Sequence, residues 1–225
     1  MKKLISLILC LCLILGTVPG VLAAEEQTYL ALGDSITAGY GVLYPQGPAD
    51  AGSTICQDGT QAYAWLTAEA LDADATIVCR SGIGVTAGHT PYNMDTYYSA
   101  AFYNRTPNVP YKPTRKPDII VVNLGTNDAM STLDADAFIA QIESFIKMLR
   151  DVNGENVPIF WVYGMMNDAK WNWTNTAIQN LGGESAGLYG VKMPLTRDGG
   201  NNHPSLEAHE NAASILTNII KQKIK

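Results

Sequence analysis

Short apolar runs that alternate with helical patterns are the feature that most constrains how this chain folds. Four runs, at residues 29–32, 75–79, 118–124 and 157–163, are rich in Val, Ile or aromatic side chains, and a weaker fifth lies at 188–193. Runs of this kind, without polar alternation, are typical of strands buried on both faces. We therefore expect a parallel sheet of about five strands.

Helical patterns occupy the intervals between these runs. Residues 61–71 are rich in Ala, 134–150 carry an apolar stripe at Phe138, Ile142, Phe145 and Leu149, and 205–223 repeat such a stripe after a candidate N-cap at Ser205. Strands that alternate with helices imply parallel βαβ units, and hence an α/β fold built as a three-layer α/β/α sandwich. Because residues 25–225 contain no internal repeat, linker or charge block, we expect them to form one domain.

The N-terminal segment has the layout of a secretory signal peptide. Lys2 and Lys3 precede an apolar stretch at 4–15, and small residues lead to Ala23 and Ala24. A 12-residue stretch is too short to span a bilayer core of about 30 Å at 1.5 Å per residue. We therefore expect residues 1–24 to be removed by cleavage after Ala23 or Ala24. The mature protein would then be secreted, with no stable membrane insertion.

Net charge and cysteine content bear on three questions: nucleic acid binding, disulfide formation and zinc binding. The net charge is −6, and removal of the two signal-peptide lysines leaves 13 basic against 21 acidic residues, hence −8, which argues against a nucleic acid partner. Cys56 and Cys79 remain after cleavage, and they are compatible either with a disulfide or with separate thiols. No C-x-x-C or H-E-x-x-H pattern occurs, so the sequence suggests neither a structural nor a protease-type zinc site.

Four segments that contain Gly, Ser, Asn, Asp or His lie at the ends of the predicted strands or directly before the last helix. They are Gly33-Asp34-Ser35, a loop with Gly82 and Gly84, Gly125-Thr126-Asn127-Asp128, and His203-Pro204-Ser205. Ligands of open parallel sheets bind beyond the carboxyl ends of the strands, where a serine hydroxyl, a glycine N–H and an Asn amide could serve acyl transfer. Taken singly, each segment is equally compatible with a turn or a cap. His89 and His209 have no evident partner, and we expect them to be solvated.

In order and spacing, these four segments resemble the sequence blocks of the SGNH (GDSL) hydrolases, and the resemblance covers essentially the whole mature chain. It implies a flavodoxin-like fold and a serine esterase that needs no metal or cofactor. Ser35 would be the nucleophile and His203 the general base. The oxyanion hole would comprise the N–H groups of Ser35 and Gly84 and the side-chain amide of Asn127.

One position departs from the family pattern. The family's acid usually lies three residues before the histidine, and here that residue is Gly200. Asp198 lies five residues before His203, in a loop that two glycines make pliable, and we expect its carboxylate to orient the imidazole. The alternative is a backbone carbonyl in that role, which would leave a Ser–His dyad.

A second serine motif has the wrong context. Gly183-Glu184-Ser185-Ala186-Gly187 fits the G-x-S-x-G nucleophile elbow, which requires a strand before it and a helix after it. Here a helical pattern at 173–181 precedes the motif and a strand-like run follows it. We therefore expect Ser185 to have no catalytic role.

Aromatic residues beside Asn and Asp suggest the substrate class. Tyr92, Trp171 and Trp173 could stack on sugar rings, with Asp34 beside the nucleophile, although each aromatic ring is equally suited to packing in the core. We expect an esterase that removes acetyl or short acyl groups from carbohydrate, with a small-molecule or polysaccharide ester as its partner. The alternatives are a lysophospholipase or general acyl esterase, and a non-catalytic carbohydrate-binding module on the same fold. The sequence predicts no particular oligomeric state.

Overall fold

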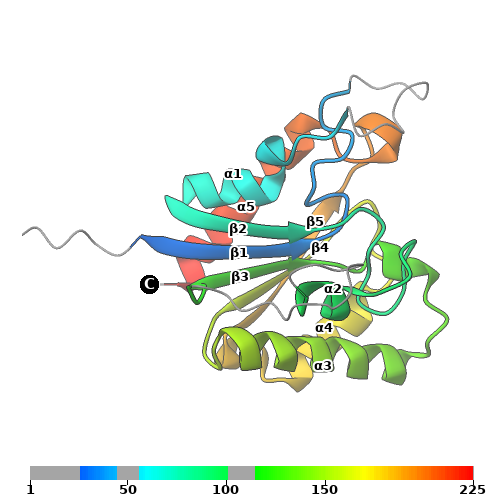
Figure 1. Ribbon diagram of the computed structural model, residues 1–225, viewed down its shortest axis with the longest axis vertical. Helices are drawn as coiled ribbons and strands as arrows, with labels where there is room; N and C mark the ends of the chain where they lie inside the picture. Colours follow the sequence, from blue (N-terminus) through cyan, green and yellow to red (C-terminus); the bar gives the residue numbers. More distant parts are fainter. Residues whose placement is uncertain (1–25, 45–55, 101–114, 225) are drawn as a thin grey trace, which may run out of the picture.

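A five-stranded parallel sheet runs through the centre of the molecule (Figure 1). In the computed structural model, residues 26–44, 56–100 and 115–224 are described; the predicted signal peptide and parts of the loops at 39–59 and 90–116 lie outside these ranges. The strands are β1 (Gln27–Gly33), β2 (Ala73–Cys79), β3 (Ile119–Asn123), β4 (Ile159–Met165) and β5 (Leu188–Leu195). Their order in the sheet is β2-β1-β3-β4-β5. This confirms the predicted parallel sheet of five strands.

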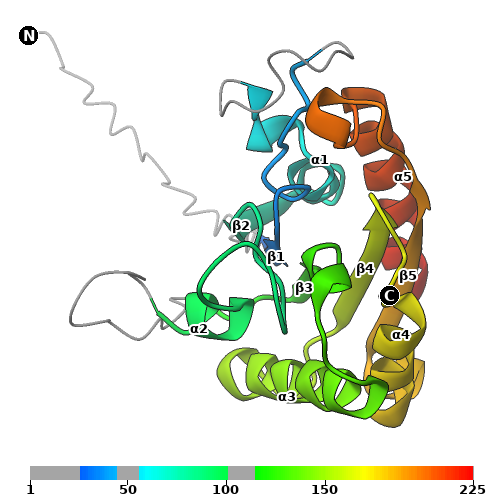
Figure 2. The ribbon, with the colours of Figure 1, turned by 90° about the vertical axis from the view of Figure 1, so that its right-hand side faces the viewer.

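Helices cover both faces of the sheet, which confirms the three-layer sandwich (Figure 2). Helices α1 (Tyr63–Ala70) and α5 (Leu206–Lys223) pack on one face, and α3 (Ala135–Asn153) and α4 (Trp171–Asn180) pack on the other. A short helix, α2 (Met94–Tyr98), joins the α3 layer and was not predicted, because it lies within a segment rich in Tyr, Asn and Pro. Among the described residues, no helix is both long enough and apolar enough to cross a bilayer.

The central strands contribute alternate residues to two separate cores. Leu30, Ile120 and Trp161 face α3 and α4, whereas their neighbours in the chain, Ala31, Val121 and Phe160, face α1 and α5. Both sets are buried, and for this reason the sequence of these strands lacks polar alternation. β2 differs because it lies at the edge of the sheet. Asp74 and Thr76 are exposed there, so the prediction that this run is buried on both faces is wrong.

Side-chain caps begin the two long helices. The Asp134 carboxylate accepts a hydrogen bond from Ala137 N at 2.9 Å at the start of α3. Ser205 Oγ accepts one from Ala208 N at 3.3 Å at the start of α5, which confirms the predicted N-cap. No disulfide joins Cys56, which is buried, to Cys79, which ends β2.

The strand order determines where a ligand can bind. The chain passes from β1 to β2 on one side and then to β3 on the other, so the order reverses between β1 and β3. Crevices form beyond the carboxyl ends of the strands at such a reversal. The loop that follows β1 begins at Asp34 and Ser35, directly at this point.

Candidate active site

Ser35 and His203 meet at the carboxyl end of β1. Ser35 Oγ lies 2.9 Å from His203 Nε2, although 168 positions of sequence separate the two residues. The chain turns sharply after β1, with Ala38 N donating to Asp34 O and Tyr40 N donating to Ser35 O. His203 precedes α5. Both side chains are almost fully buried, with 8% and 9% of their surface exposed. The structure therefore places a hydroxyl beside an imidazole, as the sequence predicted.

Two glycines hold the Ser35 turn against the His203 loop. Gly200 N donates a hydrogen bond to Gly41 O at 3.1 Å. Gly41 has a φ of +82°, and a Cβ atom there would lie only 2.4 Å from Gly200 O. Because any side chain at Gly41 would separate the two backbones, this contact depends on glycine. It fixes the distance between the loops that carry the nucleophile and the imidazole.

A backbone carbonyl orients the imidazole. His203 Nδ1 lies 3.0 Å from Asn201 O, and since a carbonyl can only accept, Nδ1 carries the proton and Nε2 is left to accept from Ser35 Oγ. Asn201 has left-handed backbone angles (φ 52°, ψ 44°), which are part of the turn that aims this carbonyl. Burial lowers the pKa of His203 below its ordinary value of 6.5, and the hydrogen bond to Asn201 O opposes this shift.

Asp198 has a different role from the one expected. Its carboxylate accepts hydrogen bonds from Thr196 Oγ1, from Ser205 N at 3.0 Å and from Ser205 Oγ at 2.8 Å. Burial disfavours the charged form of Asp198, but these hydrogen bonds outweigh it and lower the pKa. The expectation that Asp198 orients His203 is wrong in this geometry, because the carboxylate is directed at the N-terminus of α5.

The three expected oxyanion donors differ in availability. Among the described residues, no acceptor faces the N–H of Ser35 or of Gly84. Asn127 Nδ2 already donates to Asp34 Oδ2 at 3.1 Å and to Ile83 O at 2.9 Å, so both of its protons have partners. A third bond from this amide requires that one proton be shared. The two backbone N–H groups therefore have protons free for a ligand, whereas the Asn127 amide does not.

Two buried carboxyl groups support these donors. Asp34 accepts from Ile36 N at 2.9 Å and from Asn127, and burial raises its pKa to about 7. Asp128 accepts from the backbone N–H groups of Val85, Thr86 and Ala87 and from Thr86 Oγ1, at 2.6–3.1 Å. Asp128 thus ties the loop with Gly84 to the loop after β3. This role of Asp128 was not predicted from the sequence, although the residue follows a strand whose carboxyl end lies at the same edge of the sheet as Gly84.

A pocket of about 410 Å³ opens over Ser35 and His203. It is lined by Ser35, Tyr40, Ser81, Gly82, His89, Thr126, Asn127, Met166, Asn201 and His203. Tyr40 packs against the imidazole, with ring centroids 4.7 Å apart. In the loop that follows β2, Gly82 lines this pocket. Gly84 packs behind it, where a Cβ atom would lie 1.7 Å from Ala87 O.

The four residues expected to line the substrate site lie outside this pocket. Asp34 is buried beneath it. Tyr92 belongs to the core beside α2, with its ring stacked on Tyr97. Trp171 and Trp173 begin α4, and they contact Tyr163 and Phe138 respectively. Packing within and against the core, the alternative weighed above, accounts for all three aromatic side chains.

The remaining histidines and the second serine are also placed by the structure. His89 is exposed and lines the pocket, whereas His209 is fully buried and its Nδ1 accepts from Tyr63 N at 3.1 Å, so the expectation that His209 is solvated is wrong. Ser185 lies in a short helical turn between α4 and β5 and donates to Gly182 O, which confirms the reversed context. No group of three or more potential metal-ligating side chains gathers within the described ranges.

Comparisons with known proteins find similar chains among carbohydrate esterases. The cellulase/esterase CelE of Acetivibrio thermocellus is 29% identical over 224 residues, covering 88% of this chain and 26% of its own. An acetylxylan esterase / glucomannan deacetylase of Cellvibrio japonicus is 27% identical over 225 residues, covering 91% of this chain and 62% of its own. This chain therefore spans 26% and 62% of the lengths of these two relatives.

A solved structure and a family profile complete the comparison. A family two carbohydrate esterase from Clostridium thermocellum, in complex with cellohexaose, superposes with a TM-score of 0.76 at 26% identity, over 88% of this chain and 65% of that one. The profile of the GDSL-like Lipase/Acylhydrolase family matches residues 31–213, which includes the Ser35 turn and the His203 loop. The chain belongs to the GDSL-like lipase/acylhydrolase family, the SGNH hydrolases.

Proposed function

We propose that this protein is a carbohydrate esterase that removes acetyl or other short acyl groups by a Ser35–His203 mechanism. The observation that carries the proposal is the 2.9 Å contact between Ser35 Oγ and His203 Nε2 at an open pocket. The names of the relatives support the substrate class, since they include an acetylxylan esterase and a cellulase/esterase. A hydroxyl beside an imidazole acceptor serves acyl transfer, whereas a binding module has no use for a base in that place.

In the first half of the reaction, Ser35 Oγ attacks the ester carbonyl while its proton passes to His203 Nε2. The tetrahedral intermediate collapses to an acyl-enzyme when the sugar oxygen leaves with the proton from Nε2. In the second half, His203 Nε2 takes a proton from the water that attacks the acyl-enzyme. The bond to Ser35 Oγ then breaks, the proton passes from Nε2 to Oγ, and the carboxylic acid departs. Throughout both steps the bond from Nδ1 to Asn201 O, 3.0 Å long, keeps the ring in place.

The absence of a carboxylate at Nδ1 changes the electrostatics of the base. The carbonyl of Asn201 carries only a partial negative charge, so it stabilises the imidazolium less than an Asp would. Backbone donors at the oxyanion then supply much of the transition-state stabilisation. We assign this role to the N–H groups of Ser35 and Gly84, which have no acceptor among the described residues, and Asn127 would join them by sharing a proton now bonded to Ile83 O or Asp34. Loss of one oxyanion donor typically lowers the rate by about 10²–10³-fold.

Acetate release from p-nitrophenyl acetate and from acetylated xylan fragments tests the proposal, with Ser35→Ala as the control. We expect the wild type to hydrolyse both esters and the variant to lose nearly all of this activity. Equal rates in the two proteins would instead favour a non-catalytic binding module. A series of acyl chain lengths then separates the candidate esterases, because preference for long chains would identify a lysophospholipase or general acyl esterase.

We also propose that the protein is secreted, on the basis of the signal-peptide layout of residues 1–24. The mature chain would begin at Ala24 or Glu25 and fold as one domain. N-terminal sequencing of the protein recovered from the culture medium of an expressing bacterium tests this. Recovery of the full-length chain with Met1 intact would contradict it.

A further inference from the structure

Two arginines adjoin residues that line the pocket, and neither has a carboxylate partner among the described residues. Among the described residues, Arg115 pairs with Asp74 and Arg150 donates to Ala186 O, but Arg80 and Arg197 form no ion pair. Arg80 directly follows β2 and Arg197 follows β5, the two outer strands of the sheet, and Ser35 lies between them at the end of β1. The two guanidinium groups therefore come from opposite edges of the sheet toward the same end.

Aromatic rings hold the Arg80 side chain. Its guanidinium carbon lies 5.0 Å from the centroid of the Tyr92 ring and 6.0 Å from that of Tyr97. Stacking of this kind fixes the plane of the guanidinium but leaves its N–H donors free. The next residue, Ser81, lines the pocket. Tyr92, which the sequence suggested as a sugar-binding ring, instead supports a cation beside the pocket.

A backbone carbonyl holds Arg197. Its Nε donates to Met166 O at 2.6 Å, and Met166 lines the pocket. The side chain is exposed, so its two terminal nitrogens remain available to a ligand. A guanidinium that is fixed through Nε presents these nitrogens as a fork that matches the two oxygens of a carboxylate.

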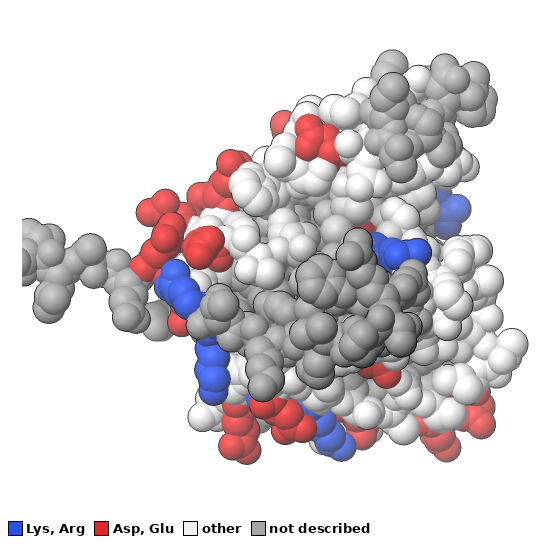
Figure 3. Space-filling model, in the orientation of Figure 1, with Lys and Arg blue, Asp and Glu red and all other residues white. Residues whose placement is uncertain are grey.

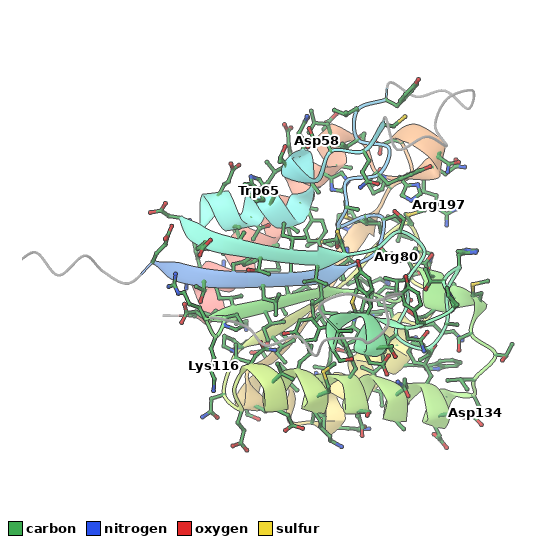
Figure 4. All side chains as sticks on the ribbon, viewed as in Figure 1. Asp58, Trp65, Arg80, Lys116, Asp134 and Arg197 are labelled. Atoms are coloured by element: carbon green, nitrogen blue, oxygen red, sulfur yellow. The ribbon has the colours of Figure 1, made fainter. Side chains whose placement is uncertain are left out.

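The positive charge of these two arginines contrasts with the acidic character of the rest of the chain. The chain has a net charge of −6, yet the residues that line the described pocket include no carboxylate. Figure 4 places Arg80 and Arg197 at the end of the sheet to which the strands point, with Lys116 at the opposite end. In the same orientation, Figure 3 shows most acidic groups along the upper left and lower margins, away from these two arginines. An acidic protein thus carries two arginines without ion-pair partners, among the described residues, at the end of the sheet that holds its candidate active site.

We propose that Arg80 and Arg197 bind carboxylates of the substrate, so that the natural ester is an acetylated glycan that carries uronic acid units. This inference rests on the proposed function and names the substrate class for it. Ester hydrolysis takes place at Ser35, while carboxylates on sugars next to the acetylated one meet the two guanidinium groups. A glycan with spaced uronic acids needs only these local charges, unlike a nucleic acid, whose dense charge the net −6 of the chain repels.

A matched pair of substrates tests the inference. One is an acetylated oligosaccharide with a uronic acid unit, and the other is the same compound with the carboxyl group reduced to the alcohol. The uronic acid is placed in the main chain in one arm and on a branch in a second arm. The readout is the ratio of kcat/KM for acetate release from the acidic and the reduced compound, so a general change in activity cancels.

We expect the wild type to favour the acidic compound by roughly 5- to 20-fold at low salt, with about 2- to 5-fold from each arginine as in exposed ion pairs. The preference should shrink as NaCl is raised. Arg80→Gln and Arg197→Gln should each reduce the ratio, and the double variant should bring it close to one. Arg80→Lys keeps the charge and should retain part of the preference. Arg115→Gln, at the other end of the sheet, is the matched control and should leave the ratio unchanged.

Separate outcomes distinguish this inference from the proposed function. A wild-type ratio near one in both arms, with normal hydrolysis of p-nitrophenyl acetate, would overturn the inference alone. So would a preference that survives in the double variant. Failure of the wild type to hydrolyse any ester would overturn the proposed function and the inference with it. A ratio that falls with Arg80→Gln and Arg197→Gln but not with Arg115→Gln would support the inference.

Discussion

Replacement of Asp198 tests whether this hydrolase works as a dyad. In the structure, the carboxylate contacts Thr196 and Ser205 and not the imidazole, so its removal should weaken the start of α5 and leave the contact between Ser35 and His203 in place. Asp198→Ala removes three hydrogen bonds to a partly exposed carboxylate. The expected loss in the free energy of unfolding is about 2–3 kcal/mol, since such bonds and caps contribute about 1 kcal/mol each. For a chain of this size, that lowers Tm by roughly 5–10 °C.

The effect on catalysis should be much smaller than for a triad acid. Loss of the Asp from a Ser-His-Asp triad lowers kcat by about 10⁴-fold, because the imidazole loses its orienting partner. Here the Asn201 carbonyl remains at Nδ1, so we expect kcat/KM for a short ester to fall by less than about 10-fold. Asp198→Asn retains one acceptor oxygen, and it should lie close to the wild type in both stability and rate.

The assay combines thermal unfolding with acetate release, measured well below the lowest Tm of the set. Ser205→Ala serves as the matched control, because it removes the N-cap of α5 and one hydrogen bond to the Asp198 carboxylate while the carboxylate keeps its charge. The two variants should lose stability together and keep most of their activity. If Asp198→Asn loses 10³-fold or more in kcat while Ser205→Ala does not, Asp198 acts as the catalytic acid and the argument from geometry is refuted.

Three further predictions concern His203, His209 and the turn that precedes His203. Because burial lowers the pKa of His203 below 6.5 and the base must be neutral, the acid limb of kcat/KM should have its midpoint below pH 6.5; a midpoint above that value would contradict the argument. Burial and the nearby His203 lower the pKa of His209 to about 4 in the folded protein. Between pH 6.5 and pH 4 the unfolded chain therefore binds a proton at this histidine that the folded chain does not bind. The free energy of unfolding should fall by about 3 kcal/mol as the pH drops through this range. Denaturant melts across this range should show the effect, and His209→Asn should remove most of it. Asn201→Val should lower kcat by about 10-fold or more, because a β-branched residue resists the left-handed angles at this position, whereas Asn201→Gly should keep its activity.

The arrangement of strands and helices could be predicted from the sequence because burial is uniform in the centre of the sheet. Ile120 and Val121 point to opposite faces and are both apolar, which is the signature of a strand covered by helices on two sides. The same rule failed at β2, because an edge strand has one neighbour and Thr76 can face solvent. It also failed for α2, since five residues are too few to display a helical period.

The pairing of Ser35 with His203 was predictable because parallel strands bring their carboxyl ends to one edge. The partners within the loops were not. Whether Asp198 reaches the imidazole depends on backbone angles that the loop adopts at Asn201 and Asn202, and spacing in sequence carries no information on them. The stacking of Tyr92 beneath Arg80 likewise depends on where α2 packs.

The dyad itself follows from how closely two loops approach each other. At Gly200, where the family usually has its acid, a Cβ atom would lie 3.1 Å from Gly41 Cα and from Gly41 O. A side chain there requires Gly41 or Gly200 to shift by a few tenths of an ångström, which strains the turn that holds Ser35 Oγ against His203 Nε2. With glycine at both positions the loops touch, and the left-handed turn at Asn201 brings its carbonyl to Nδ1. The close backbone approach thus disfavours the usual acid and supplies its replacement, so we expect Gly200→Asp to weaken the catalytic contact and not to restore a triad.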